Sequence, residues 1–204
     1  MDLQYFIIAF TSIISILNPI GAIPVFVSLT ESYPKNEKII IAKKTAIYTA
    51  AILYIFTLFG EYILKFFGIT LNAFKIAGGL LLVLIALDMV RGHQKSKIHE
   101  KDIKHAEDVD EIALMPLATP LLAGPGSITA CMVAMAGAEG FNKFLVLLAI
   151  GLCIIITYIT LLFAEKIIEK IGKLGIRIFT RMMGFLLLAI AVQMIISGLK
   201  GSLF

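Results

Sequence analysis

Two long stretches of the chain, residues 3–30 and 112–138, contain no charged side chain. A helix on the surface of a soluble protein needs a polar face, so uncharged stretches of 28 and 27 residues are typical of segments that lie in lipid. Over the whole chain only 16% of residues are charged, against about 25% in an average soluble domain. The sequence therefore predicts an all-α membrane protein with a single transmembrane domain over residues 1–204.

Apolar segments divide the chain into six predicted spans, at about 3–30, 42–64, 70–90, 112–136, 143–164 and 178–199. No Lys or Arg precedes Lys35, so we expect the first span to be retained and not to act as a cleaved signal peptide. A straight helix of 28 residues is about 42 Å long, whereas the hydrocarbon core is about 30 Å thick. The first and fourth spans are therefore expected to tilt or to break.

Basic residues are concentrated in three of the segments outside the spans. Residues 31–44, 91–111 and 165–181 together hold fourteen of the 18 Lys and Arg residues. The other four are Lys65, Lys75, Lys143 and Lys200. Because cytoplasmic loops carry an excess of Lys and Arg, the three basic segments are predicted to be cytoplasmic and both termini extracytoplasmic. The expected location is the inner membrane of a prokaryotic cell.

The two halves of the chain resemble each other. The stretch NPIGAIP (18–24) aligns with TPLLAGP (119–125) at an offset of 101, with the same spacing between prolines. The stretch GGLLLVLIALDM (78–89) aligns with MGFLLLAIAVQM (183–194) at an offset of 105. Each copy holds three spans, so the second copy must enter the membrane from the opposite face. We predict a 3+3 inverted-topology repeat with repeat one at 1–90, a cytoplasmic loop at 91–111 and repeat two at 112–204.

The paired prolines predict that helices 1 and 4 are discontinuous at the membrane midplane. Proline removes a backbone donor and pushes the preceding residue out of the helical region. Freed backbone groups cannot face lipid, so they must face protein, a cavity or a ligand. In transporters with inverted repeats, such breaks hold the substrate. The simpler alternative is that the prolines only kink the helices and shape the bundle.

Specific roles follow for residues at the two breaks. Gly21 and Pro24 are expected to mark the restart of the first helix, with Asn18 supplying an amide. Ser127 is expected to cap the restarted fourth helix, where Gly124 and Gly126 let backbone approach a ligand. The N–H groups of a helix N-terminus bind a carboxylate, so a small zwitterion suits such a site. The predicted substrate-binding residues are Asn18, Pro19, Ile20, Gly21, Ala22, Thr119, Pro120, Ala123, Gly124, Gly126, Ser127 and Ile128.

Asp88 is the one acidic residue well inside a predicted span. An acid in a membrane is a candidate for ion coupling, here with H+ or Na+. Arg91 lies three residues further on, so an ion pair at the membrane surface is the alternative.

The motifs LNPIGAIPVF (17–26) and PLATPLLAGPGSI (116–128), each followed by its glycine- and leucine-rich span, resemble those of the MarC/SnatA family of membrane proteins. The similarity covers nearly the whole chain. It implies a six-span transporter of neutral amino acids such as glycine and alanine, with the first and fourth helices discontinuous. It does not fix the substrate or the direction of transport.

The sequence also bears on other functions. An exporter or channel for another small polar solute stays open. A membrane thiol carrier would use Cys131 and Cys153, but these cysteines do not occupy equivalent repeat positions. His93, His99 and His105 lack the spacing of a metal motif, and no hydrolase motif occurs. We therefore expect no enzyme activity, cofactor, metal or nucleic-acid partner, and expect the lipid bilayer as the surroundings.

Overall fold

The computed structural model describes residues 2–91 and 109–203, and all of the elements in these ranges are helices. The prediction of an all-α protein is confirmed for this part of the chain. In chain order the helices are α1 (Asp2–Leu17), α2 (Pro19–Thr30), α3 (Lys35–Phe66), α4 (Leu71–Arg91), α6 (Val109–Ile112), η1 (Ala113–Leu122), α7 (Pro125–Ala136), α8 (Phe141–Leu162) and α9 (Ala164–Leu203).

Within the described ranges, five stretches of helix are long and apolar enough to cross a membrane, namely Leu3–Thr30, Lys35–Phe66, Leu71–Arg91, Phe141–Leu162 and Leu174–Ser202. A sixth is obtained if the helices on either side of a 62° bend, Val109–Leu122 and Pro125–Ala136, count as one span. These segments overlap the six predicted spans, with different ends. Helix α3 begins at Lys35, inside a segment expected to be a loop, because a charged helix can continue beyond the lipid while hydropathy detects only the apolar part.

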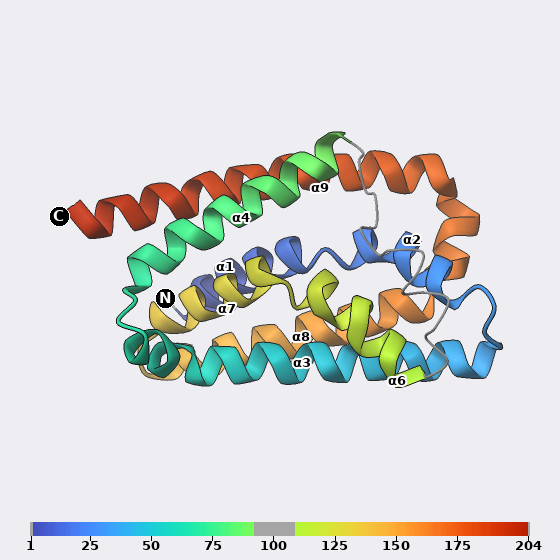
Figure 1. Ribbon diagram of the computed structural model, residues 1–204, viewed down its shortest axis with the longest axis horizontal. Helices are drawn as coiled ribbons and strands as arrows, with labels where there is room; N and C mark the ends of the chain where they lie inside the picture. The colour runs from blue at the N-terminus through green and yellow to red at the C-terminus, as the bar shows by residue number, and fades with distance from the viewer. Residues whose placement is uncertain (1, 92–108, 204) are drawn as a thin grey trace.

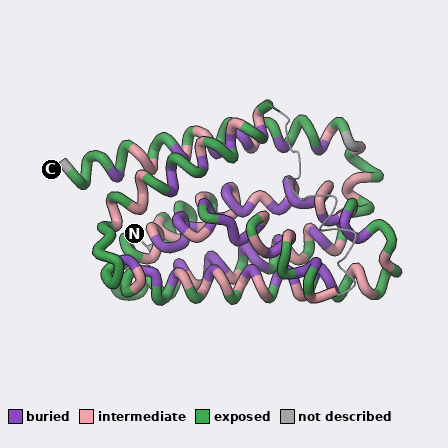
Figure 2. The backbone as a smooth tube through the Cα atoms, viewed as in Figure 1, coloured by how far each residue is buried: buried purple, intermediate pink, exposed green. Residues whose placement is uncertain are grey.

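The helices form three layers, as Figure 1 shows. Helices α4 and α9 pair along their length in one outer layer, and α3 and α8 pack together in the opposite one. Between them lie α1, α2 and α7, and η1 packs against α3. Buried residues are concentrated in this middle layer and on the faces turned toward it (Figure 2).

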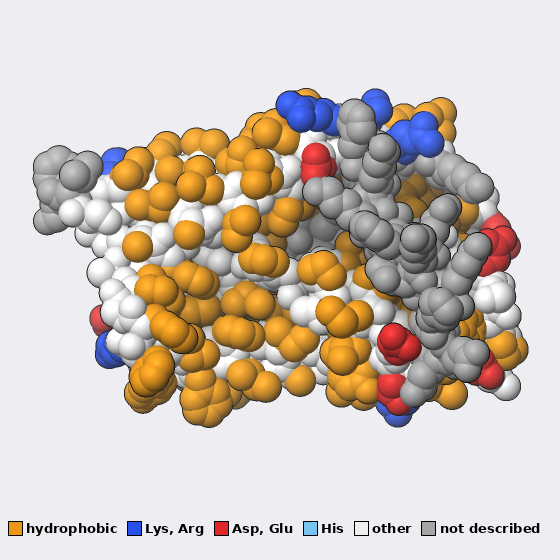
Figure 3. Space-filling model, in the orientation of Figure 1, with side chains coloured by type: hydrophobic (Ala, Val, Ile, Leu, Met, Phe, Trp, Pro, Cys, Tyr) orange, Lys and Arg blue, Asp and Glu red, His pale blue; other side chains and the backbone are white. Residues whose placement is uncertain are grey.

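The outer surface is largely apolar. Large hydrophobic side chains such as Tyr62, Leu84 and Phe141 are more than half exposed, and Figure 3 shows such side chains over most of the visible face. A soluble protein rarely exposes an apolar surface of this extent, whereas lipid would cover it without cost. The α2–α3 connection and the start of α9 lie at one end of the molecule, and both termini lie toward the other (Figure 1).

Close contact between α4 and α9 depends on glycine. A Cβ atom added to Gly79 would lie 2.9 Å from the carbonyl oxygen of Ala191, and one added to Gly184 would lie 3.1 Å from that of Ala86. Any side chain at these positions would push the two backbones apart. Gly79 and Gly184 therefore permit close packing of the two helices.

Candidate functional site

The first span is interrupted at Asn18. Helix α1 ends at Leu17, Asn18 adopts a left-handed conformation with φ 45° and ψ 63°, and α2 begins at Pro19. The Asn18 Oδ1 atom accepts a hydrogen bond of 3.3 Å from the N–H of Gly21, which caps α2. Asparagine is one of the few residues that tolerate this backbone conformation, and it also caps well. Restart at Gly21 and Pro24 was thus a wrong prediction, because Pro19 already fits the first helical position.

A larger interruption lies between η1 and α7, in the second half of the chain. Within η1, Met115 and Thr119 have extended φ and ψ angles, and each is followed by a proline. The chain then leaves the helix at Ala123 and enters α7 with Gly124 as the cap residue. Ser127 lies inside the first turn of α7, so its predicted role as the cap is wrong. Pro125 takes the first helical position, where a residue without an N–H group is favoured.

The start of α7 presents two backbone donors. The N–H of Ile128 is bonded to the carbonyl of Gly124 at 3.1 Å, and Pro125 has no N–H. Among the described residues, no hydrogen bond is recorded for the N–H groups of Gly126 and Ser127. Both residues are buried. Two adjacent N–H groups at a helix N-terminus are a suitable site for an anion or a carboxylate.

The two interruptions lie close together in the middle layer. A Cβ atom added to Gly126 would lie 3.4 Å from Cγ2 of Ile16, two residues before Asn18. Figure 1 shows the α1–α2 and η1–α7 connections at a similar depth along the bundle. The start of α7 therefore packs beside the end of α1, so segments from both halves of the chain meet next to Asn18.

Eleven of the twelve predicted residues are buried or half-buried. The buried ones are Pro19, Gly21, Ala22, Ala123, Gly124, Gly126 and Ser127; the half-buried ones are Asn18, Ile20, Thr119 and Ile128; and Pro120 is exposed. The glycines contact protein in this conformation. A side chain at Gly126 would overlap Leu82, one at Gly21 would overlap Asn18, and one at Gly124 would lie 2.5 Å from the Pro120 carbonyl oxygen.

Asp88 lies on an exposed face of α4, close to its end at Arg91. The ion pairs recorded among the described residues are Lys38–Glu165, Lys44–Asp110 and Lys65–Glu61, so the expected pair with Arg91 is not among them. Ion coupling through Asp88 stays a prediction.

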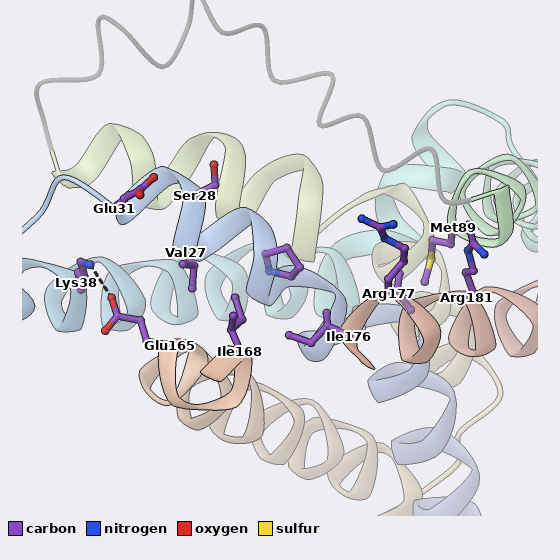
Figure 4. Close-up of a pocket in the computed structure, with 12 residues that line it drawn as sticks. Val27, Ser28, Glu31, Lys38, Met89, Glu165, Ile168, Ile176, Arg177 and Arg181 are labelled. Atoms are coloured by element: carbon purple, nitrogen blue, oxygen red, sulfur yellow. Dashed lines mark hydrogen bonds and ion pairs between the residues drawn. The ribbon is translucent and has the colours of Figure 1, made fainter. Parts of the chain in front are cut away.

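A cavity of about 630 Å³ lies at the end of the bundle where α2, α3, α4 and α9 meet (Figure 4). Its lining includes Pro24, six residues after Asn18, and the charged side chains of Glu31, Lys38, Glu165, Arg177 and Arg181. The ammonium of Lys38 and the carboxylate of Glu165 point toward each other across it and lie 2.6 Å apart. Thr180 also lines the cavity, and its buried hydroxyl has no partner among the described residues.

A second cavity, of about 640 Å³, lies at the other end, between α3, α4, α7 and α8. Glu61, Lys65 and Lys143 line it, with Glu61 and Lys65 paired at 2.8 Å. Sequence reasoning missed both cavities, because their linings come from four elements and carry no local motif.

Cysteines and possible metal ligands lie outside the breaks. Cys131 and Cys153 are buried free thiols. No group of His, Cys, Asp or Glu suited to a metal ion occurs among the described residues. The three histidines at 93, 99 and 105 lie outside the described ranges.

Asp110 was predicted to lie in the cytoplasmic loop at 91–111, but it belongs to α6 and its side chain contacts α3. Its carboxylate accepts hydrogen bonds from the ammonium of Lys44, at 2.6 Å, and from the hydroxyl of Tyr48. This contact fixes the start of the bent η1 segment against the neighbouring helix.

Comparison with known proteins matches residues 3–203 to the model of the MarC family of integral membrane proteins. The chain belongs to the MarC family. A UPF0056 membrane protein of Methanocaldococcus jannaschii is 70% identical over the whole of both chains. A relative in Pyrococcus horikoshii is 42% identical over 98% of this chain and 96% of its own length. A UPF0056 membrane protein of Bacillus subtilis, YvbG, is 34% identical over 98% of this chain and 97% of its own.

The similarity between the motifs and the MarC/SnatA family is thus confirmed, and with it the assignment as an integral membrane protein with several spanning helices. No solved structure matches this MarC-family chain. The relatives' names describe membrane proteins and state no substrate.

Proposed function

We propose that this MarC-family protein is a secondary transporter of small neutral amino acids, which holds its substrate between the α1–α2 and η1–α7 interruptions. The observation that carries the proposal is the meeting of the two interruptions at Ile16 and Gly126. The α7 N-terminus offers the N–H groups of Gly126 and Ser127 to a substrate carboxylate, while the C-terminal end of α1 offers carbonyl oxygens to an ammonium group. A zwitterion satisfies both.

An inverted repeat is part of the proposal, and the packing supports it. The contacts of α3 with η1 and α7 correspond to those of α8 with α1 and α2, and α2–α9 corresponds to α4–α7. The offset of 105 relates Gly79 to Gly184 and Ala86 to Ala191. The structure has the contacts Gly79–Ala191 and Gly184–Ala86. Replacing each residue of one contact by its counterpart at this offset gives the other contact. Such reciprocal contacts are expected of a two-fold relation between the halves.

Alternating access is the transport mode that this arrangement favours. Neither of the two cavities is lined by any of the twelve predicted residues. The interruptions are instead packed against Leu82 and Ile16, between one cavity at each end. A substrate site closed from both sides is one expected state of a transporter with inverted repeats. We propose that the end with Lys38 and Arg177 is cytoplasmic, on the distribution of basic residues.

A binding screen tests the substrate class directly. Purified protein in detergent is titrated with glycine, alanine and larger amino acids, with pH and Na+ varied. We expect glycine or alanine to raise the thermal unfolding midpoint, because a ligand that binds only the folded state stabilises it. Methylamine carries only the amine of glycine, and acetate carries only its carboxylate. Neither compound should have an effect. If acetate alone were as effective, the site would be an anion site and the amino-acid assignment would be wrong.

An exporter or channel for another small polar solute is the second candidate. A channel would not show counterflow, in which an excess of unlabelled solute inside vesicles drives accumulation of label. Counterflow of labelled glycine therefore separates the two candidates. The coupling ion, H+ or Na+, is assigned by imposing each gradient in turn, and Asp88→Asn tests whether Asp88 carries it.

A further inference from the structure

The two cavities occupy equivalent positions in the two halves of the chain. One is lined by α2, the start of α3, the end of α4 and the first half of α9, and the other by α7, the start of α8, the end of α3 and the start of α4. Two glycines with positive φ mark the matching corners, Gly68 with φ 67° and Gly172 with φ 75°, at an offset of 104. The segment from α8 to the kink of α9 thus corresponds to α3.

Each cavity is lined by a lysine and a glutamate. The correspondence between the halves places the two lysines at equivalent positions, and likewise the two glutamates. Lys38 and Lys143 are 105 positions apart, and Glu61 and Glu165 are 104 apart. Lys38 and Glu165 line the first cavity, whereas Lys143 and Glu61 line the second. In both cavities one partner lies in the first half of the chain and the other lies in the second half.

The two pairs differ in state. The Lys38 ammonium lies 2.6 Å from the Glu165 carboxylate. At the other end Glu61 is paired at 2.8 Å with Lys65, its neighbour on the same helix, and Lys143 takes part in none of the ion pairs recorded for the described residues. One cross-repeat pair is therefore made and its counterpart is not.

We propose that Lys38–Glu165 and Lys143–Glu61 are equivalent closing contacts at the two ends, and that the protein makes them alternately. The inference rests on the proposed function, since movement of one repeat against the other would bring one pair together while separating the other. Lys65 then acts as the competitor that holds Glu61 when its end is open. An exposed ion pair is weak, so each contact adjusts the balance of two states and does not lock either one.

Distances between spin labels test this without substrate. In a Cys131→Ala/Cys153→Ala background, one label pair is placed at the exposed residues Asn36 and Lys170, beside the first contact. A second label pair is placed at Phe66 and Phe144, beside the other contact, where both side chains are more than half exposed. Double electron–electron resonance in liposomes gives the population of short and long distances at each end.

We expect Lys38→Met to lengthen the 36–170 distance and to shorten the 66–144 distance, with the population ratio changed about two- to fivefold. Lys65→Met should act in the same direction, because it frees Glu61 for Lys143. The charge exchange Lys38→Glu/Glu165→Lys should restore the parental distribution. Lys35→Met removes a charge from the same end of α3 outside the contact, and it should change neither distance.

Three results would overturn the proposal. These are a change confined to the mutated end, a change of the same sign at both ends, and failure of the charge exchange to restore the distribution. The Lys65 side chain is 71% exposed, so Lys65→Met should leave the packing of the interior unchanged. Glycine uptake is measured in the same liposomes. Absence of uptake in the parent would refute the proposed function, while the distances would still report whether the two ends move oppositely.

Discussion

Asn18 combines two properties that the first interruption needs. Its backbone is left-handed, and its side-chain oxygen accepts the N–H of Gly21. Aspartate keeps the cap, glycine keeps only the backbone conformation, and alanine keeps neither.

Substitution of Asn18 should therefore lower stability in a fixed order. We expect Asn18→Gly to cost little and Asn18→Ala to cost about 1–2 kcal/mol. Asn18→Asp keeps the cap but places a carboxylate at a half-buried position inside a span, so it should cost more than the glycine variant. Thermal unfolding midpoints in one detergent give the order. Equal midpoints for the glycine and alanine variants would show that the left-handed conformation is not needed in the protein.

Gly126 is where a packing role and a binding role can be separated. A methyl group there would overlap Leu82, which is fully buried. Gly126→Ala should lower the unfolding midpoint. Leu82→Ala should lower it too, because the loss of a buried leucine side chain costs about 2–5 kcal/mol of stability. In the double variant the methyl fills space vacated by Leu82, so the two losses should be less than additive.

Glycine uptake should nevertheless stay low in the Gly126→Ala/Leu82→Ala variant, because the added methyl lies beside the proposed carboxylate site. Leu82→Ala alone serves as the control and should retain uptake. Full uptake in the double variant would mean that Gly126 serves packing only.

The residues at the breaks could be predicted in part. The prolines at 19, 120 and 125 follow from their chemistry and from the repeated spacing, and they lie at the interruptions. The cap of α7 was placed three residues too late, because Ser127 was favoured as a cap over Gly124 although Pro125 fits the first helical position. The packing of Leu82 against Gly126 could not be predicted, because it joins residues from different spans.

Among the elements, α4 and α9 give the most direct test of the repeat. Gly79 and Gly184 each face a backbone carbonyl of the other helix, at 2.9 and 3.1 Å from an added Cβ. Backbone cannot yield as a side chain can, so either substitution must separate the helices.

We expect Gly79→Ala and Gly184→Ala to destabilise the protein by similar amounts, each about 1–3 kcal/mol. Ala77→Val, on an exposed face of α4, is the matched control and should be neutral. Unfolding midpoints compare the three. A large effect at one glycine with none at the other would contradict an equivalent role in the two halves.

Element ends were harder to predict than element positions. Hydropathy located the apolar parts of α3 and α9, but α3 extends outward to Lys35 and α9 begins at Ala164 and bends at Gly172. Helix continues wherever backbone bonding and packing allow it, whether or not the segment is apolar. The irregular geometry of η1 likewise depends on its packing against α3 and on the contact of Asp110 with Lys44 and Tyr48.

For the whole molecule, composition and charge distribution predicted an apolar body with its basic segments at one end. The described residues have an apolar surface, and the basic segments 31–44 and 165–181 lie toward the same end; residues 92–108 lie outside the described ranges. The two cavities and the ion pair between Lys38 and Glu165 could not be predicted in the same way. The ion pair joins residues more than a hundred positions apart, and only the proposed repeat relates the two cavities.

The central claim is transport of a small neutral amino acid through the paired interruptions. Uptake of labelled glycine into proteoliposomes, driven by an imposed pH or Na+ gradient, tests it most directly. The account predicts time-dependent accumulation that unlabelled alanine competes and that collapse of the gradient abolishes. Uptake no greater than in protein-free liposomes under either gradient, and in counterflow, would contradict it.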